Sequence, residues 1–218
     1  MLERWLAALE PFKHLSPTEH ARLARVAQER CYTKGQTIFR AGQPSDAVWV
    51  VKTGRVHLMK FLQNGKASTT CVMTKGEPFC CLPALDRKAY PADAVAAEET
   101  TLVRIPAEAF HEAMARSVEF MQKTVCLFCD RLRQVEHRGC MMYAPAESRL
   151  AQILLALSKK FGPTIPLTRQ ELAEIAGTTH ETTIRTLSRF KQQGIIRSSR
   201  GRTTVVRPEQ LQALLETC

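Results

Sequence analysis

The stretch Thr168-Arg169-Gln170-Glu171-Leu172-Ala173-Glu174-Ile175-Ala176-Gly177, followed directly by Thr178-Thr179-His180-Glu181-Thr182-Thr183-Ile184-Arg185-Thr186-Leu187, carries the clearest structural signal in this 218-residue chain. Thr168 and Glu171 have the spacing of a capping box, which predicts a helix start. Gly177 suits a tight turn between two helices. Small and apolar residues would let those helices cross closely, namely Leu172, Ala173, Ala176, Ile184 and Leu187. The stretch therefore predicts a helix-turn-helix.

The sequence on either side completes a winged helix-turn-helix, predicted over residues 139–218. Gly194-Ile195-Ile196 and Thr203-Thr204-Val205-Val206 flank residues 198–202, a pattern typical of a β-hairpin wing. Upstream, an amphipathic helix is indicated by Leu150, Ile153, Leu154 and Leu157. Residues 139–145, from Gly139 to Pro145, are predicted to form a hinge before this part of the chain.

Excess positive charge gathers in the same region. The chain has 31 Lys plus Arg against 21 Asp plus Glu, a net charge of +10, and residues 141–218 hold 11 basic and 6 acidic side chains. From His180 to Arg202 the single acidic residue Glu181 is opposed by Arg185, Arg189, Lys191, Arg197, Arg200 and Arg202. A solvated basic face would be the usual interpretation. Its coincidence with the helix-turn-helix favours nucleic acid as the partner.

Composition excludes a wholly disordered chain, and the sequence shows no membrane span and no secretory signal. Hydrophobic residues make up 44% and charged residues 24%, which is ordinary for a globular protein. No run of about 18 apolar residues is present, so no membrane span is expected. The N-terminus has no secretory signal pattern, and we therefore expect the protein in the cytoplasm.

The N-terminal half has a different sequence pattern. This pattern predicts short helices over the first 30 or so residues and then a β-sandwich or barrel. Ser16-Pro17-Thr18-Glu19 predicts a capped helix. Asn64-Gly65 is a strong hairpin signal between short β-type runs. Those runs are Thr37-Ile38-Phe39, Val48-Trp49-Val50-Val51, Arg55-Val56-His57-Leu58-Met59 and residues 67–73.

A helical heptad pattern joins the two halves. Apolar residues with 3-4-3-4-3 spacing predict a helical seam, formed by Val118, Met121, Val125, Phe128, Leu132 and Val135. A second line on the same helix contains Phe120, Thr124 and Leu127. One face for the β-rich half and one for a second copy is the economical interpretation, although a helix packed only within its own domain would show a similar seam. A homodimer is predicted.

With these motifs the chain resembles the Crp/Fnr family of bacterial transcription regulators over essentially its whole length. Gly35-x-x-Ile38-Phe39-x-x-Gly42 and Gly54-x-Val56 resemble that family's cyclic-nucleotide-binding β-roll. Ala146-Glu147-Ser148-Arg149-Leu150-Ala151 and residues 168–173 resemble its winged helix. The resemblance implies an α+β fold with a jelly-roll-like β-roll sensory domain (1–115), a long central dimerisation helix (116–138) and a winged helix-turn-helix (139–218). It also implies a dimer that binds double-stranded DNA and RNA polymerase. The sequence has no recognisable set of nucleophile, base and orienting residue and no phosphate loop, so we do not expect an enzyme.

The resemblance assigns roles to residues of the second helix. Arg185 can contact guanine O6 and N7, and Glu181 can accept from cytosine N4. Both match family residues that read a TGA-like half-site, while His180 occupies a variable specificity position. Phosphate contacts are expected from Arg169, Gln170, Thr179, Thr182, Arg189, Arg200 and Arg202.

Cyclic AMP is not the expected effector. In the family's cyclic-AMP receptors a Gly-Glu pair contacts the ribose and an Arg-Ser pair the phosphate. Here the matching positions are Cys80-Cys81 and Pro91-Ala92, although Arg87 and Lys88 lie nearby. The N-terminal cysteines of the oxygen-sensing branch are absent too, since the first cysteine is the solitary Cys31. Haem bound through Cys80, Cys81 or His57 stays open.

Eight cysteines are unusual for a cytosolic chain of this size. Cys80, Cys81, Cys126 and Cys129 are the candidates for a thiol site, because the family's effector pocket lies between these segments. Thiolates there would suit a metal, a metalloid, an iron–sulfur cluster or reversible oxidation. Free cysteines also occur simply as small buried apolar residues. Three functions thus compete: a thiol-responsive regulator, a constitutively competent regulator without effector, and a thiol-dependent redox enzyme.

Overall fold

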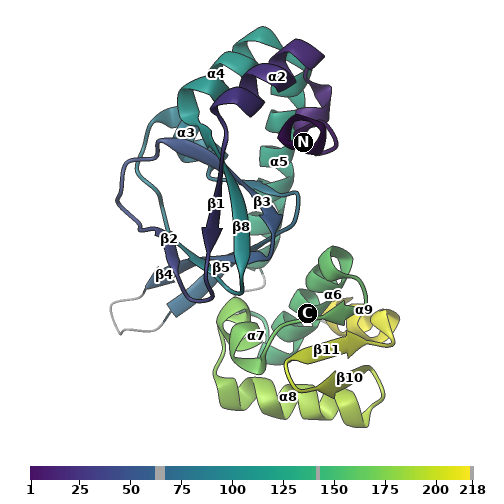
Figure 1. Ribbon diagram of the computed structural model, residues 1–218. Helices are drawn as coiled ribbons and strands as arrows, with labels where there is room; N and C mark the ends of the chain where they lie inside the picture. The colour runs from purple at the N-terminus through teal and green to yellow at the C-terminus, as the bar shows by residue number, and fades with distance from the viewer. Residues whose placement is uncertain (62–66, 141–142, 217–218) are drawn as a thin grey trace. The chain divides into compact units, whose positions relative to one another are not determined.

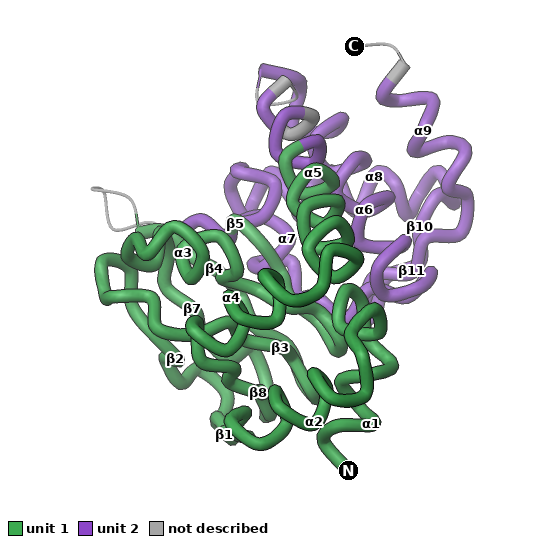
Figure 2. Tube along the Cα trace, turned by 90° about the horizontal axis from the view of Figure 1, so that it is seen from above, with its two compact units in different colours: residues 1–66, 70–132 green, residues 67–69, 133–218 purple. Residues whose placement is uncertain are grey.

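The computed structural model describes residues 1–61, 67–140 and 143–216 (Figure 1). Two compact units divide the chain, one of residues 1–66 and 70–132 and one of residues 67–69 and 133–218 (Figure 2). Each unit has its own buried apolar core. No helix in the described ranges combines the length and the apolar character needed to cross a membrane. The predicted hairpin turn at Asn64-Gly65 falls outside those ranges.

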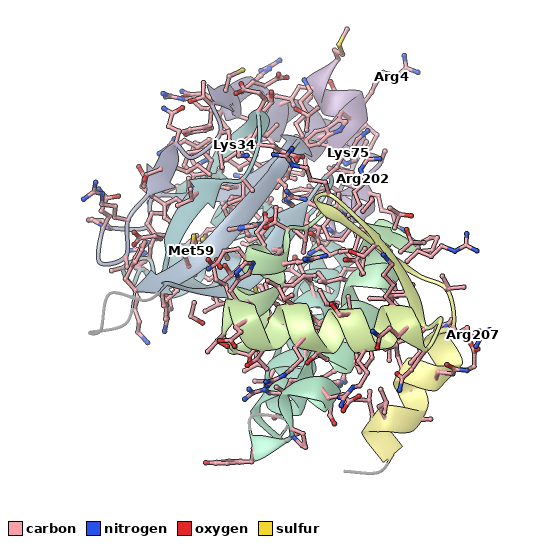
Figure 3. All side chains as sticks on the ribbon, turned by 90° about the horizontal axis from the view of Figure 1, so that it is seen from below. Arg4, Lys34, Met59, Lys75, Arg202 and Arg207 are labelled. Carbon is pink, nitrogen blue, oxygen red and sulfur yellow. The ribbon has the colours of Figure 1, made fainter. Side chains whose placement is uncertain are left out.

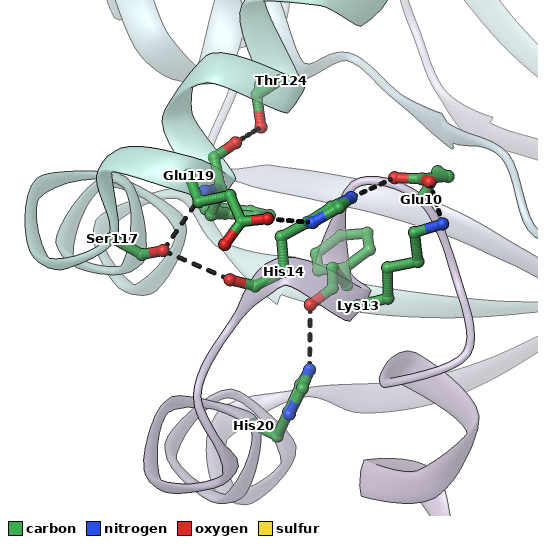
Figure 4. A network of polar contacts seen from close by, with 9 residues as sticks. Glu10, Lys13, His14, His20, Ser117, Glu119 and Thr124 are labelled. Carbon is green, nitrogen blue, oxygen red and sulfur yellow. Dashed lines mark hydrogen bonds and ion pairs between the residues drawn. The ribbon is translucent and has the colours of Figure 1, made fainter.

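Short helices open the first unit, as predicted: α1 (Leu2–Leu6), the 3-10 helix η1 (Phe12–His14) and α2 (Pro17–Val26). The Ser16 hydroxyl accepts a hydrogen bond from the Glu19 N–H at 3.3 Å, which caps α2. Nδ1 of His14 lies 2.8 Å from Oε1 of Glu119, in the first turn of the long helix α5 (Val118–Cys140) (Figure 4). This contact fastens η1 to the start of α5.

Two four-stranded sheets form the β-rich part, ordered β1-β8-β3-β6 and β2-β7-β4-β5. The strands are β1 (Gln28–Tyr32), β2 (Thr37–Phe39), β3 (Ala47–Thr53), β4 (Arg55–Phe61), β5 (Ala67–Thr74), β6 (Pro78–Phe79), β7 (Asp93–Ala96) and β8 (Thr100–Pro106). Val48 and Val50 belong to one apolar core, whereas Trp49 and Val51 belong to the other. Strand β3 is therefore buried on both faces, which explains its unbroken apolar run.

Three helices complete the first unit: α3 (Cys81–Asp86), α4 (Ala107–Arg116) and most of α5. Helix α5 begins and ends two residues further along the chain than the central helix expected at 116–138, and Gly139 is its penultimate residue. Phe120 and Thr124 are fully buried, so the predicted second face does pack within the unit. Exposed fractions between 39% and 63% are found on the seam side at Val118, Met121, Val125, Leu132 and Val135.

The second unit is a winged helix-turn-helix. Its elements are α6 (Ala146–Phe161), β9 (Thr164–Ile165), α7 (Arg169–Ala176), α8 (His180–Gln192), β10 (Ile196–Ser199), β11 (Arg202–Val205) and α9 (Pro208–Glu216). The capping box at Thr168 and Glu171 is present, and Gly177 ends α7 with φ of 58°. The predicted wing is the β10–β11 hairpin, to which β9 adds a third strand. Strand β9 and helix α9 were not predicted.

Candidate nucleic-acid interface and thiol sites

The N-terminal turn of α8 is fixed by two threonines. The Thr179 hydroxyl accepts from the Thr182 N–H at 3.1 Å, which caps the helix, and donates to Oγ1 of Thr182 at 2.9 Å. The Thr182 hydroxyl acts as an acceptor in this contact and keeps its own proton to donate. Both candidate phosphate contacts thus stand at a helix N-terminus, which favours anions.

Helix α8 buries one face and exposes the other. Thr183, Leu187 and Phe190 are buried in the second unit. His180, Glu181 and Arg185 are exposed, as a surface that enters a groove must be. Glu181 and Arg185 stand four residues apart and so share a helix face. Neither is paired with another residue within the described part of the chain.

The remaining candidates for phosphate contacts differ in whether their side chains already have a partner within the unit. Arg169, Arg200 and Arg202 are exposed, and Figure 3 labels Arg202, the first residue of β11. Arg189 instead forms an ion pair with Glu147 of α6. Its charge is therefore partly neutralised within the unit, which the sequence did not indicate. The Gln170 amide donates to Oε1 of Glu174 at 2.9 Å.

Cys80 and Cys81 stand at the start of α3. Cys80 has φ of 58°, a left-handed conformation that is uncommon for a residue other than glycine. Cys81 is only 1% exposed. Burial raises the pKa of Cys81 to about 11, and burial together with the neighbouring Cys81 raises the pKa of Cys80. Both thiols are therefore protonated near pH 7.

Arg131 of α5 is a candidate that sequence reasoning missed. Its charge acts on both Cys80 and Cys81 and opposes the effect of burial on each pKa. Its guanidinium donates to the carbonyl of Pro78 in β6. Arg131 follows Thr124 by seven residues and so continues the line of Phe120 and Thr124. That spacing is the signal that would have found it.

The two cysteine pairs differ in their exposure to solvent. Cys126 and Cys129 are exposed on α5, whereas Cys81 is buried. No group of three or more Cys, His, Asp or Glu side chains in the described ranges could hold a metal ion. The charge of Arg131 in α5 acts on Cys80 and Cys81, whereas Cys126 and Cys129 on the same helix are exposed. That the two pairs approach each other stays a prediction.

The other candidates are scattered. Cys31 is exposed and Cys71 half-buried, while the side chain of Cys140 and all of Cys218 lie outside the described residues. His57 is buried in β4. Near the expected phosphate position, Pro91 is exposed and Ala92 buried. Arg87 is exposed, and Nζ of Lys88 lies 3.2 Å from Oδ2 of Asp86.

Known protein families match both units. Residues 29–117 match the cyclic nucleotide-binding domain, and residues 148–214 match the Crp-like helix-turn-helix domain. The cyclic AMP receptor protein of Thermus thermophilus is 30% identical over 196 residues, which cover 89% of this chain and 91% of that protein. The transcriptional activator protein FnrA of Stutzerimonas stutzeri is 25% identical over 180 residues, 78% of this chain and 73% of the relative.

Solved structures have the same fold. The structure of FixK2 from Bradyrhizobium japonicum superposes with a TM-score of 0.79 at 24% identity, over 87% of this chain and 97% of that one. The catabolite activator protein of Thermus thermophilus gives a TM-score of 0.53 at 28% identity, over 94% of this chain and 98% of that one.

Proposed function

The chain belongs to the Crp/Fnr family of transcription regulators, and from this premise we propose that it acts in the cytoplasm as a dimer that binds a palindromic DNA site with TGA-like half-sites. The observation that carries the proposal is the exposed surface of His180, Glu181 and Arg185 at the capped start of α8. Docking of that turn into the major groove would bring Arg185 and Glu181 to base edges. RNA polymerase is the partner expected from the resemblance.

Arg185 offers the sharpest test of this DNA-reading role. We expect Arg185→Ala to weaken binding to a duplex with inverted TGA-like half-sites by about 1–3 kcal/mol and to leave binding to a scrambled duplex nearly unchanged. Fluorescence anisotropy at one fixed salt concentration would measure both affinities. Lys159→Ala, which removes an exposed charge from the last turn of α6, is the matched control. Equal weakening on both duplexes would contradict the assignment.

The proposed dimer rests on the exposed seam of α5. Val118, Val125 and Leu132 each leave about half of their surface or more in water, in a heptad pattern suited to a second helix. A twofold dimer would place its two α8 helices to read half-sites about 34 Å apart, as palindromic sites require. A chain that sediments as a monomer at micromolar concentration would contradict this.

We propose that the signal is carried by cysteine thiols and not by cyclic AMP. The relative named above is a cyclic AMP receptor protein, but here buried Cys81 takes the place where the resemblance puts the ribose-binding glutamate. Pro91 and Ala92 supply no charge for the phosphate, which would have to rely on Arg131 or Arg87. A buried anion without a dedicated partner is costly.

Titration with cyclic AMP tests this part of the proposal. DNA affinity should stay within twofold of its starting value at millimolar cyclic AMP, whereas thiol-directed reagents should change it. Tightening of tenfold or more by the nucleotide would contradict the thiol signal. If neither treatment changes DNA binding, the constitutively competent regulator replaces it.

A further inference from the structure

Two of the described cysteines form an exposed pair. Cys126 and Cys129 lie three residues apart in α5, and both are exposed. Residues at this spacing share a helix face, with Cβ atoms about 5–6 Å apart. By contrast, Cys81 is buried and Cys80 is half-buried. Cys126 and Cys129 are therefore the pair that an external reagent can reach.

Helix geometry suits a bridging atom better than a direct bond between the sulfurs. A disulfide needs Cβ atoms about 3.5–4.5 Å apart and sulfurs about 2.05 Å apart, so it would distort the helical turn. Two metal–sulfur bonds of about 2.3 Å at a tetrahedral angle hold the sulfurs about 3.8 Å apart. That separation needs less distortion from side chains whose Cβ atoms stand at the helical spacing.

The number of donors limits which atom can bridge. Structural zinc and iron–sulfur clusters take four protein ligands, and no three-donor group exists in the described ranges. Within one chain, a centre held by Cys126 and Cys129 must therefore need only two thiolates and accept a non-protein group for its remaining valence. A trivalent thiophilic metalloid, with one hydroxide left in place, meets this requirement.

We propose that Cys126 and Cys129 form a dithiol site for a trivalent metalloid of the arsenite class. This inference rests on the proposed thiol-borne signal and names the chemistry of that signal. Each thiol proton joins a metalloid-bound hydroxide, which leaves as water, while a sulfur–metalloid bond replaces the broken oxygen–metalloid bond. Two waters are released, one hydroxide stays on the metalloid, and no oxidation state changes.

The site borders the exposed seam. Cys129 follows Phe128 directly and lies one helical turn from Val125 and from Leu132. A metalloid bound there adds bulk and a hydroxide beside the surface proposed for the second copy. Capture at this site would thus act on the dimer without entering the buried surroundings of Cys80 and Cys81.

Phenylarsine oxide, which bridges two thiols, is the probe for this site. We expect the reduced full-length protein to bind one arsenical tightly, as counted by intact-mass spectrometry, and to release it to a dithiol but not to glutathione. Cys126→Ser and Cys129→Ser should each weaken binding by about 10²–10⁴-fold, because the second bond loses its effective concentration. Cys31→Ser and Cys80→Ser/Cys81→Ser should bind like the parent protein.

A spacing rescue separates the pair from either thiol alone. Lys123 is exposed and precedes Cys126 by three residues, so Lys123→Cys in the Cys129→Ser background should restore tight binding. Tight binding that survives in Cys126→Ser/Cys129→Ser would overturn the proposal. The proposal would also be overturned if the parent protein failed to retain the arsenical and peroxide converted Cys126 and Cys129 to a disulfide. DNA binding by untreated protein is measured separately, and its loss would count against the regulator function alone.

Discussion

Burial sets the chemistry of the cysteines at the scale of single residues. Cys81 is fully enclosed and keeps its proton well above neutral pH, whereas Cys126 and Cys129 lie in water. Since the thiolate is the reactive form, the raised pKa values of Cys80 and Cys81 make both thiols poor nucleophiles in this conformation. Arg131 supplies a positive charge beside them, so any anionic product formed there would have a partner ready.

A pH-dependent stability follows from Cys81. Its raised pKa, about 11, means that the folded state keeps a proton that the unfolded chain loses from about pH 9 upward. The contribution of Cys81 to the unfolding free energy should be complete below about pH 8.5. It should fall as the pH approaches 11, by up to about 3 kcal/mol. Urea denaturation under reducing conditions at pH 8 and pH 10.5 would measure it.

Cys81→Ala should lose less stability over that pH interval than the parent protein. Cys31→Ala, which removes an exposed thiol, is the matched control and should follow the parent. The same pH dependence in all three proteins would show that Cys81 does not contribute.

At the scale of elements, the turn between β3 and β4 depends on close approach of the backbone. Gly54 has φ of 80°, and a Cβ added there would stand 2.5 Å from the carbonyl oxygen of Glu99. Gly35 has nearly the same φ, 81°, but open space around the added Cβ. These two glycines therefore separate the cost of a left-handed conformation from that of a steric clash.

Gly54→Ala should be more destabilising than Gly35→Ala. Both variants carry the cost of positive φ, but only the first forces apart the turn and the start of β8, which typically adds about 1–3 kcal/mol. Thermal or urea denaturation of the two variants gives the difference directly. Equal losses would mean that β8 moves aside freely at Thr100.

Helix α5 presents the second element-scale prediction. Leu132 is 58% exposed in the C-terminal part of the seam, so Leu132→Glu places like charges opposite each other in the proposed dimer. The dimer dissociation constant should rise at least about tenfold, as measured by analytical ultracentrifugation. Gln134→Glu adds the same charge at an exposed position away from the seam and should change it little. A dimer unaffected by Leu132→Glu would be built from another surface.

For the whole molecule, the basic excess should govern how DNA affinity depends on salt. Removing one phosphate contact from each subunit with Arg202→Ala should lower affinity for all sequences. It should also make the slope of log affinity against log salt shallower by about 2 for the dimer. Lys159→Ala, outside the proposed interface, should leave the slope as it is. An unchanged slope in Arg202→Ala would show that Arg202 of the wing does not contact DNA phosphate.

Local patterns predicted much of this structure, because caps, turns and helix faces depend on residues that are close together in the sequence. The capping box at Thr168, the cap at Ser16 and the two-sided helix around Phe120 are examples. What the sequence did not predict depends on contacts between distant segments. The charge of Arg131 beside Cys81, the pairing of Arg189 with Glu147 and the added strand β9 belong to this class.

Helix α5 also divides the consequences of mutation between two thermodynamic regimes. Its buried face, with Phe120 and Thr124, belongs to the folding of one chain, so damage there lowers the melting temperature at any protein concentration. Its exposed face would stabilise the protein only through dimer formation, so the stability that it contributes grows as the protein becomes more concentrated. Melting curves recorded over a dilution series would therefore assign any substitution in α5 to one face or the other.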